Sequence, residues 1–328
     1  MDFSGVMKIL PAPKVFLPAL RKSRLYSQKT RSAPSTTTNH EPYMPELPEV
    51  EVICRGLAPT LRGRKIVTAS FSRQKMRLPL PAQQISTWIV GRRIKGVRRM
   101  AKFILLDMDS TASLVVHLGM TGRLNFFPAG TAPAKHDHAR WLLDNGLELR
   151  FNDTRRFGSI QVLKPGQDPA EVFGTLGPDP FWPEFNAGYL AERARGRAIP
   201  VKNLLMDNRV VTGIGNIYAS EILHASGVNP ATPAGHLDDR ELQKIAANSR
   251  LILEAAIACG GTTIADYVNS RGEKGYFQTQ LQVYGREGEA CHTCGKTIRQ
   301  VRLGGRASYY CPACQPEPAL HKPAKKRR

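Results

Sequence analysis

Residues 140–151 read RWLLDNGLELRF, two largely apolar runs joined by Asp144-Asn145-Gly146. Asn-Gly tolerates the positive φ angles of a tight turn, so this stretch predicts two adjacent antiparallel strands. On either side within residues 64–164, the segments RKIVTASF, RRIKGV, FILLDM, SLVVHLGM and SIQVLK read as further strands, with no helix of useful length between them. The pattern is typical of an antiparallel β-sandwich or barrel.

The segments before and after these strands have helical periodicity. Val50, Ile53, Leu57 and Leu61 recur at helical spacing, which predicts one amphipathic helix ahead of the strands. The Pro/Gly-rich stretch 166–185 predicts a linker, and the helices expected beyond it cover 187–195, 203–208, 216–226 and 238–258. We therefore expect an α+β fold with a leading helix and β-sandwich (44–165), a helical domain (186–282) and a Cys-bearing β module (283–315).

The charge of the chain predicts a polyanionic partner. Its 328 residues include 47 Lys plus Arg against 27 Asp plus Glu, a formal charge of +20. Hydrophobic residues make up 41%, enough for a folded core. No run of about 18 uncharged apolar residues occurs, so we expect no membrane span. Nucleic acid is the first candidate, although an acidic membrane face would attract the same charge.

Both ends of the chain read as basic tails, and we expect the first, residues 1–43, to be a disordered arm. Residues 1–43 hold seven basic and two acidic residues, and 316–328 end in HKPAKKRR. Between them, residues 44–320 keep 35 basic and 25 acidic residues, so the tails alone do not explain the charge. Residues 1–43 fit an organellar targeting peptide. The alternative is an upstream start codon whose translation has no consequence for the protein.

Four of the six cysteines have the spacing of a zinc site. Cys291-x2-Cys294 and Cys311-x2-Cys314 are separated by sixteen residues. Each pair suits a tight turn, and two such turns bring four thiolates to one tetrahedral Zn²⁺. Two disulfides or free thiols are the alternatives. Cys54 and Cys259 lie on apolar helix faces, where we expect ordinary core residues.

Residues 44–51, MPELPEVE, carry the strongest chemical signal. Removal of Met44 would leave Pro45 as a secondary amine at a chain terminus. Such an amine has a pKa of about 8, against about 10.4 for lysine, so a useful fraction is neutral and nucleophilic at neutral pH. Glu46 and Glu49 lie close by and could transfer protons. The alternative is a proline-braced helix start with acids that favour the helix dipole.

A second signal predicts an anion site. Gly213-Ile214-Gly215-Asn216 opens the helix IYASEIL, whose first N–H groups face an anion. We expect a DNA phosphate there, with an ordinary loop before a helix as the alternative.

MPELPEVE, RRMAKF, HLGMTGRL, KHDH, NDTRRFG, LLMDNRVVTGIGNIYASEIL, GGTTIADY, GYFQTQLQVYGREGEAC and the paired cysteines together resemble the formamidopyrimidine-DNA glycosylases. The resemblance runs in unbroken order over residues 44–314. It implies a helix–two-turn–helix element, a zinc ribbon, removal of oxidised purines from DNA, and cleavage of the abasic strand by β,δ-elimination. Endonuclease VIII-like enzymes are similar in fold but typically open Pro-Glu-Gly-Pro, where this chain has Leu47.

The resemblance implies roles for individual residues. Pro45 would attack the sugar C1′, Glu46 would transfer a proton with support from Glu49, Lys102 would serve β-elimination and Arg306 δ-elimination. Met120, Arg155 and Phe157 would fill the space left by a flipped base, a step that excision from a duplex requires. Further DNA contacts would come from His136, Lys202, Asn216 and, on a weaker match, Arg197. Residues Arg271–Phe277 resemble the loop that closes over the base.

Three classes of function remain to be distinguished. The iminium set Pro45, Glu46, Lys102 and Arg306 favours a base-excision enzyme over a non-cleaving, zinc-dependent sensor of damaged DNA. A base-specific transcription factor lacks an obvious recognition helix. We expect a monomer that acts on double-stranded damaged DNA in the bacterial cytoplasm at the nucleoid, with organelle import through residues 1–43 as the alternative. We also expect the working protein to begin at Pro45.

Overall fold

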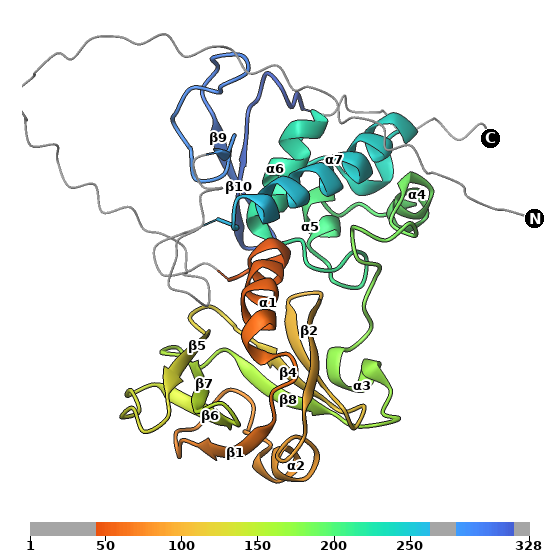
Figure 1. Cartoon of the computed structure of the whole chain (residues 1–328). Coiled ribbons are helices and arrows are strands. Elements are labelled where there is room, and N and C mark those ends of the chain that lie inside the picture. Colours follow the sequence, from red (N-terminus) through yellow and green to blue (C-terminus); the bar gives the residue numbers. More distant parts are fainter. Residues whose placement is uncertain (1–43, 263–279, 318–328) are drawn as a thin grey trace, which may run out of the picture. The chain divides into compact units, whose positions relative to one another are not determined.

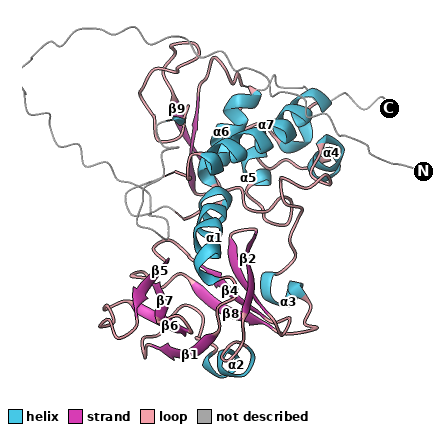
Figure 2. Ribbon diagram, viewed as in Figure 1, coloured by secondary structure: helices cyan, strands magenta, loops and turns pink. Residues whose placement is uncertain are grey.

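The computed structural model describes residues 44–262 and 280–317, which all belong to one compact unit, Pro42–Arg328. The seven sequence-predicted strands and one further strand, β5, form two four-stranded antiparallel sheets, ordered β1-β6-β7-β5 and β2-β3-β4-β8 (Figures 1 and 2). Their bounds are Ile66–Phe71 (β1), Ile94–Met100 (β2), Phe103–Met108 (β3), Ser113–His117 (β4), Arg123–Pro128 (β5), Asp137–Leu143 (β6), Leu147–Asn152 (β7) and Ser159–Leu163 (β8). The expected antiparallel sandwich is confirmed.

The predicted hairpin joins β6 to β7 at Asp144-Asn145-Gly146, and Gly146 has a φ of 78°. Trp141 and Phe151 of this hairpin are fully buried in the sandwich core. Two elements of the β-sandwich part were missed. Strand β5 ends in proline and is mostly half-buried, so its apolar alternation is weak. Helix α2 (Ala82–Trp88) has a single buried residue, Ile85, and so shows no periodicity.

Helix α1 (Leu47–Leu61) belongs to two hydrophobic cores at once. Val50, Ile53 and Leu57 pack into the sandwich core, whereas Leu47 at its first turn packs into the core of the helical part. Burying an aliphatic side chain of this size contributes about 1.5–3 kcal/mol. The start of α1 is therefore held from both sides, and the expected reactive residues lie at that start.

The helical part contains α4 (Ala187–Ala194), α5 (Val201–Leu205), α6 (Asn216–Ser226), a 3-10 turn (Ala234–His236) and α7 (Asp239–Ala258). The helix predicted at 203–208 lies earlier in the sequence, at Val201–Leu205, because it begins after Pro200 and ends at Met206. A short helix α3 (Pro169–Phe173) lies within the expected linker. Helix α6 is buried on nearly every face, which explains why its sequence lacks a polar side.

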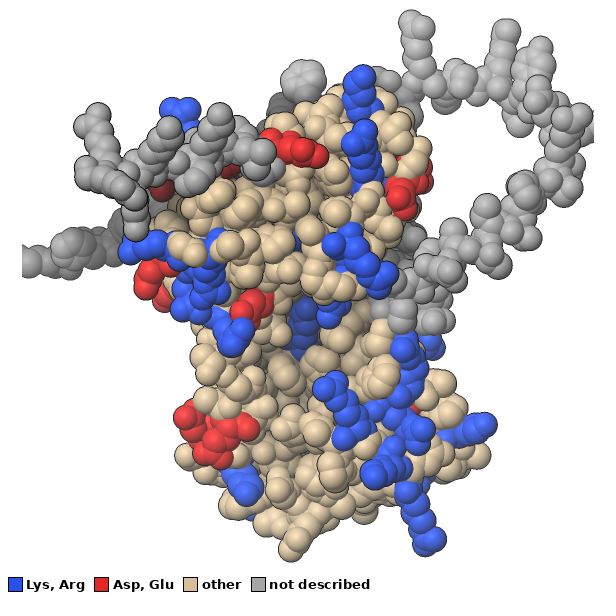
Figure 3. All heavy atoms as spheres, turned by 180° about the vertical axis from the view of Figure 1, so that it is seen from behind, with Lys and Arg blue, Asp and Glu red and all other residues tan. Residues whose placement is uncertain are grey.

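The last described segment is a hairpin of β9 (Arg299–Leu303) and β10 (Arg306–Tyr310) beside the cysteine pairs. No helix within the described ranges is long and apolar enough to cross a membrane. Figure 3 shows one face of the molecule on which blue Lys and Arg side chains outnumber red acidic ones. This distribution suits the polyanionic partner expected from composition.

Candidate active site

The site starts at the N-terminus of α1. Pro45 is buried, and the Glu46 backbone N–H donates to Glu49 Oε2 at 2.9 Å, one half of a capping box. Pro48 occupies the first turn, where its missing N–H costs no hydrogen bond. The sequence PELPE therefore folds locally into a rigid start that fixes Pro45 and Glu46 together.

The Glu46 side chain reaches the N-terminus of α6. Its carboxylate accepts the backbone N–H groups of Gly215 (2.7 Å), Ile217 (3.0 Å) and Tyr218 (3.4 Å). A Cβ at Gly215 would lie 2.3 Å from the Glu46 carboxyl carbon, so only glycine allows this approach. The prediction that these N–H groups face a DNA phosphate was wrong in that respect. The anion is a carboxylate of the same chain, which satisfies the same dipole.

Glu49 is fully buried and connects three segments. Its carboxylate accepts hydrogen bonds from the Tyr218 hydroxyl (2.7 Å) and from the N–H and hydroxyl of Thr262 (both 2.9 Å), besides the Glu46 N–H. A buried carboxylate would be costly without such partners. Glu49 therefore joins α1 to α6 and to the segment after α7, and its oxygens are occupied by structural bonds.

Lys102 lies in the tight turn between β2 and β3, next to Ala101, whose φ of 52° is unusual for a residue with a side chain. Its Nζ donates to the Ile214 carbonyl at 3.3 Å, beside the Glu46 carboxylate. Burial lowers the pKa of Lys102, the Glu46 charge opposes this, and the Arg306 charge adds to the lowering. Burial likewise raises the pKa of Glu46, against the charge of Lys102. Two groups with pKa values moved toward neutrality are typical of an acid–base site.

Arg306 begins β10 at the tip of the β9–β10 hairpin, and its side chain is exposed. At the tip, Gly304 lies against Asn203 of α5 so closely that a Cβ would come within 2.7 Å of the Asn203 amide nitrogen. The hairpin is therefore packed against the helical part. Arg306 lies close enough to Lys102 for its positive charge to lower the pKa of Lys102.

Lys202 and Asn216 are brought together, as expected, but neither is exposed. The Lys202 ammonium, 1% exposed, donates to Asn216 Oδ1 (2.6 Å), the Ala307 carbonyl (2.9 Å) and Ser308 Oγ (2.7 Å). These bonds join α5, α6 and β10, and they compensate the burial of a charge that would otherwise cost several kcal/mol. Their contact with DNA stays a prediction.

Met120, Arg155 and Phe157, which are expected to fill the space left by the flipped base, lie on two adjacent loops. The Arg155 guanidinium lies 4.9 Å from the centre of the Phe157 ring, and Phe157 is 42% exposed. Met120 and Phe157 line a pocket of about 440 Å³ that also includes Met44. The structure therefore places Met120 and Phe157 beside Met44, the first described residue of the chain.

His117, to which the sequence assigned no role, lines the same pocket. Burial, reinforced by the charges of Lys102 and Arg77, lowers the pKa of His117 to about 4. The ring is therefore neutral, and its Nδ1 accepts the Gly119 N–H at 3.1 Å. Its place in HLGMTG, three residues before Met120, was the available signal.

The other predicted DNA contacts are less central. His136 is half-buried, and its Nδ1 has no hydrogen-bond partner among the described residues. Asp137 and His138 of the same motif are buried and form hydrogen bonds within the β-sandwich. Arg197 closes the turn after α4, where its carbonyl accepts the Gly235 N–H. Within residues 44–262 and 280–317, no hydrogen bond or ion pair joins Arg197 to Lys102. The predicted loop Arg271–Phe277 lies outside the described residues.

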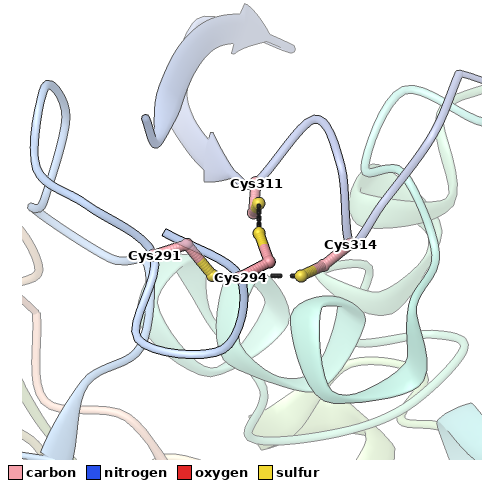
Figure 4. Close-up of side chains that lie close together, drawn as sticks. All are labelled: Cys291, Cys294, Cys311 and Cys314. Atoms are coloured by element: carbon pink, nitrogen blue, oxygen red, sulfur yellow. Dashed lines mark hydrogen bonds between the residues drawn. The ribbon is translucent and has the colours of Figure 1, made fainter. Parts of the chain in front are cut away.

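The four predicted zinc cysteines converge in the last module (Figure 4). The sulfur atoms of Cys291, Cys294, Cys311 and Cys314 all lie within 4.8 Å of one another, and none forms a disulfide. Zn–S bonds of about 2.3 Å in a tetrahedron place sulfurs about 3.8 Å apart. The Sγ–Sγ distances of 3.9 Å for Cys291–Cys314 and 3.4 Å for Cys294–Cys311 fit that geometry. The expected core cysteine Cys54 is buried, and Cys259 is half-buried against the helical core.

We expect Cys294→Ser to lose zinc and, with it, the fixed position of Arg306. Structural zinc contributes about 10–16 kcal/mol to the folding of small modules. Metal content by mass spectrometry should fall toward zero, and strand cleavage should stop after β-elimination. Cys259→Ser, a cysteine outside the cluster, is the control and should keep both properties. A Cys294→Ser protein with full zinc content and unchanged cleavage products would contradict this assignment.

Comparison with known proteins identifies the family. Three family models match in order: Formamidopyrimidine-DNA glycosylase N-terminal domain (44–160), Formamidopyrimidine-DNA glycosylase H2TH domain (176–268) and Zinc finger found in FPG and IleRS (288–316). The formamidopyrimidine-DNA glycosylase of Xanthomonas campestris pv. campestris (strain B100) is 45% identical over 272 residues, which are 83% of this chain and all of that protein.

Solved structures agree. A mutant of the Lactococcus lactis FPG bound to DNA containing Fapy-dG matches with a TM-score of 0.78 and 29% identity. MutM in complex with DNA containing carbocyclic 8-oxo-G matches with a TM-score of 0.76 and 30% identity. Each match covers 83% of this chain and 100% of the other. The fold and site define a DNA glycosylase with AP lyase activity. The chain belongs to the formamidopyrimidine-DNA glycosylase family. A DNA partner and a structural zinc are thereby confirmed.

Proposed function

We propose that this protein removes oxidised purines, 8-oxoguanine and formamidopyrimidines, from double-stranded DNA, with Pro45 as the nucleophile once its nitrogen is a free amine. One observation carries the proposal. The Glu46 side chain, next in sequence to the buried Pro45, and the Lys102 amine meet at the start of α6, where Glu46 accepts the Gly215 N–H and Lys102 donates to the Ile214 carbonyl. Burial raises the pKa of Glu46 and lowers the pKa of Lys102. Such a pair is what an amine-based excision reaction needs.

The first step forms a bond between the Pro45 nitrogen and the sugar C1′, while the C1′–O4′ bond breaks and O4′ takes a proton. The Pro45 nitrogen then loses its N–H proton to the departing base, which leaves with the electrons of the N-glycosidic bond, and the nitrogen lone pair forms a cationic iminium. Glu46 is proposed as the donor of the proton that O4′ takes, because burial raises the pKa of its carboxyl. Glu49 is proposed to position Glu46 rather than to exchange protons, since its carboxylate binds Tyr218 and Thr262.

The later steps cleave the strand. Loss of a C2′ proton from the iminium drives out the 3′ phosphate, and Lys102 is proposed to take that proton, because its lowered pKa favours the neutral amine. A second elimination expels the 5′ phosphate. The exposed, cationic Arg306 is proposed to bind this leaving group.

DNA binding is proposed to use two further sets of residues. Met120, Arg155 and Phe157 would occupy the space of the flipped nucleotide, with Arg155 bonding to the orphaned base. His136, Lys202, Asn216 and Arg197 would contact the DNA backbone, and Arg271–Phe277 would cover the extruded base. The division into 44–165, 166–185, 186–282 and 283–315, with tails at 1–43 and 316–328, also stays a prediction.

The substrate class is supported by the similar structures, whose DNA contains Fapy-dG or 8-oxo-G. The bacterial relatives support action in the cytoplasm of a bacterium, and we propose a monomer at the nucleoid without a membrane partner. The basic charge of the chain supports the proposed association at the nucleoid.

A substrate panel tests this function. Protein beginning at Pro45 should release 8-oxoguanine opposite cytosine, and formamidopyrimidine, faster than oxidised pyrimidines such as thymine glycol. Both strand ends should carry phosphate. Chromatography of released bases and gel analysis of the ends provide the measurements. Preferential release of thymine glycol would instead support the endonuclease VIII-like alternative, and tight binding without any release would support a damage sensor.

A further inference from the structure

Asp153 lies just after β7, and its side chain is fully buried among donors from two loops. Oδ1 accepts from the Thr121 hydroxyl and from the Arg155 N–H (3.2 Å), while Oδ2 accepts from the Gly158 N–H (2.8 Å). The Thr121 hydroxyl oxygen also accepts the Arg155 N–H at 3.0 Å. One carboxylate therefore ties the loop that carries Met120 to the loop that carries Arg155 and Phe157.

The backbone of Asp153 connects a third segment. Its N–H donates to the His136 carbonyl (3.0 Å), and its carbonyl lies 2.8 Å from His138 Nε2. Because a carbonyl oxygen can only accept, His138 donates through Nε2. Four of the residues proposed to contact DNA, namely Met120, His136, Arg155 and Phe157, are thus held around one residue that does not itself reach the surface.

The two loops also touch through their backbones. A Cβ at Gly119 would lie 2.5 Å from the Gly158 nitrogen, and one at Gly158 would lie 3.1 Å from Asp153 Oδ2. Gly119 and Arg156 have left-handed backbones, with φ of 63° and 60°. The loops therefore have little freedom to move apart, and the Asp153 carboxylate lies at their junction.

We propose that Asp153 is a positioning residue that holds Met120, Arg155 and Phe157 in the geometry in which they enter the duplex. This inference rests on the proposed function. Insertion must offset the unstacking of a base pair. Loops already fixed before binding lose no conformational entropy at that moment, so more of the binding energy is available to extrude the base. Arg155, fixed in the same way, distinguishes the base opposite the lesion.

The test separates excision from a duplex, which needs base extrusion, from cleavage of an abasic site in single-stranded DNA, which does not. In Asp153→Asn, an amide NH₂ replaces one of the two carboxylate oxygens. Because both oxygens accept hydrogen bonds, the NH₂ would face a donor and could not bond to it. We expect about a hundredfold slower release of 8-oxoguanine from duplex DNA, the size of effect that follows when a substitution displaces the reacting groups by about 1 Å. Cleavage of the single-stranded abasic site should be unchanged, and the preference for cytosine over adenine opposite the lesion should narrow.

A matched pair at Thr121 guards against general loss of structure. Thr121→Val removes the hydroxyl at nearly constant shape, and we expect about tenfold slower duplex excision, the effect of losing one hydrogen bond to a charged group. Thr121→Ser keeps the hydroxyl and should behave like the unaltered protein. Thermal unfolding of each variant is measured alongside the rates.

Two outcomes overturn the inference. One is an unchanged duplex rate and opposite-base preference in Asp153→Asn and Thr121→Val. The other is a parallel loss of duplex and single-strand activities together with a lowered unfolding temperature. Failure of the unaltered, Pro45-initiated protein to cleave either substrate would overturn the proposed function itself, so the two failures are distinguishable.

Discussion

Protein that retains Met44 ahead of Pro45 will form no covalent adduct with DNA under borohydride, whereas protein that begins at Pro45 will be trapped almost completely. In the longer protein the Pro45 nitrogen is part of a peptide bond, and its lone pair is delocalised into the carbonyl. It cannot attack a sugar carbon. As a free terminal amine, with a pKa of about 8, it can.

The experiment compares residues 1–328 with the Pro45-initiated protein on a duplex containing 8-oxoguanine opposite cytosine, and intact mass establishes the N-terminus of each. Pro45→Gly in the shorter protein is the matched control. It keeps a terminal amine and should still be trapped, more slowly. An adduct formed by protein of verified full length would show that a lysine, not Pro45, is the nucleophile.

The second large effect is expected for Glu46→Gln, which should slow base release by a factor on the order of 10³, within the range for loss of a general acid. Cleavage of a preformed abasic site should suffer less, because an abasic sugar opens to its aldehyde without proton donation by the enzyme. Glutamine keeps the side-chain length and one acceptor for the α6 N–H groups, so the fold should persist.

The rate of base release is also expected to depend on pH in a definite direction. Burial raises the pKa of Glu46, so its protonated, proton-donating form persists to higher pH than in an ordinary glutamic acid. Base release by the unaltered protein should fall as pH rises through that raised pKa. In Glu46→Gln this limb should disappear from the pH–rate profile. A variant that keeps the same limb would assign the proton transfer to another group.

The sequence predicted most of the fold because its strongest signals are local. The Asn145-Gly146 turn, the apolar period of α1 and the cysteine spacing each depend on a few neighbouring residues. The dual packing of α1 could not be predicted, since Leu47 and Val50 look alike in sequence yet enter different cores. Strand β5, short and half-buried, carried no comparable pattern.

For the site, residue identities were easier to predict than their partners. The glycines before α6 correctly indicated an anion, but nothing local distinguishes a phosphate from Glu46, which lies 169 positions before Gly215. Lys202 was chosen as a cation for DNA, and its bonds to β10, more than 100 positions away, were not predictable. His117 was missed because a histidine at a strand end has many ordinary explanations.

The long-range bonds of Glu46 and Glu49 also bear on biosynthesis. Helix α1 leaves the ribosome early, yet its two buried carboxylates find their long-range donors only when Gly215 and Thr262, 169 and 213 positions later, have been made. Domains generally fold in the order in which they are synthesised. Here the reactive terminus has to wait for distant segments. An unfinished chain would therefore have no assembled centre with which to attack the genome.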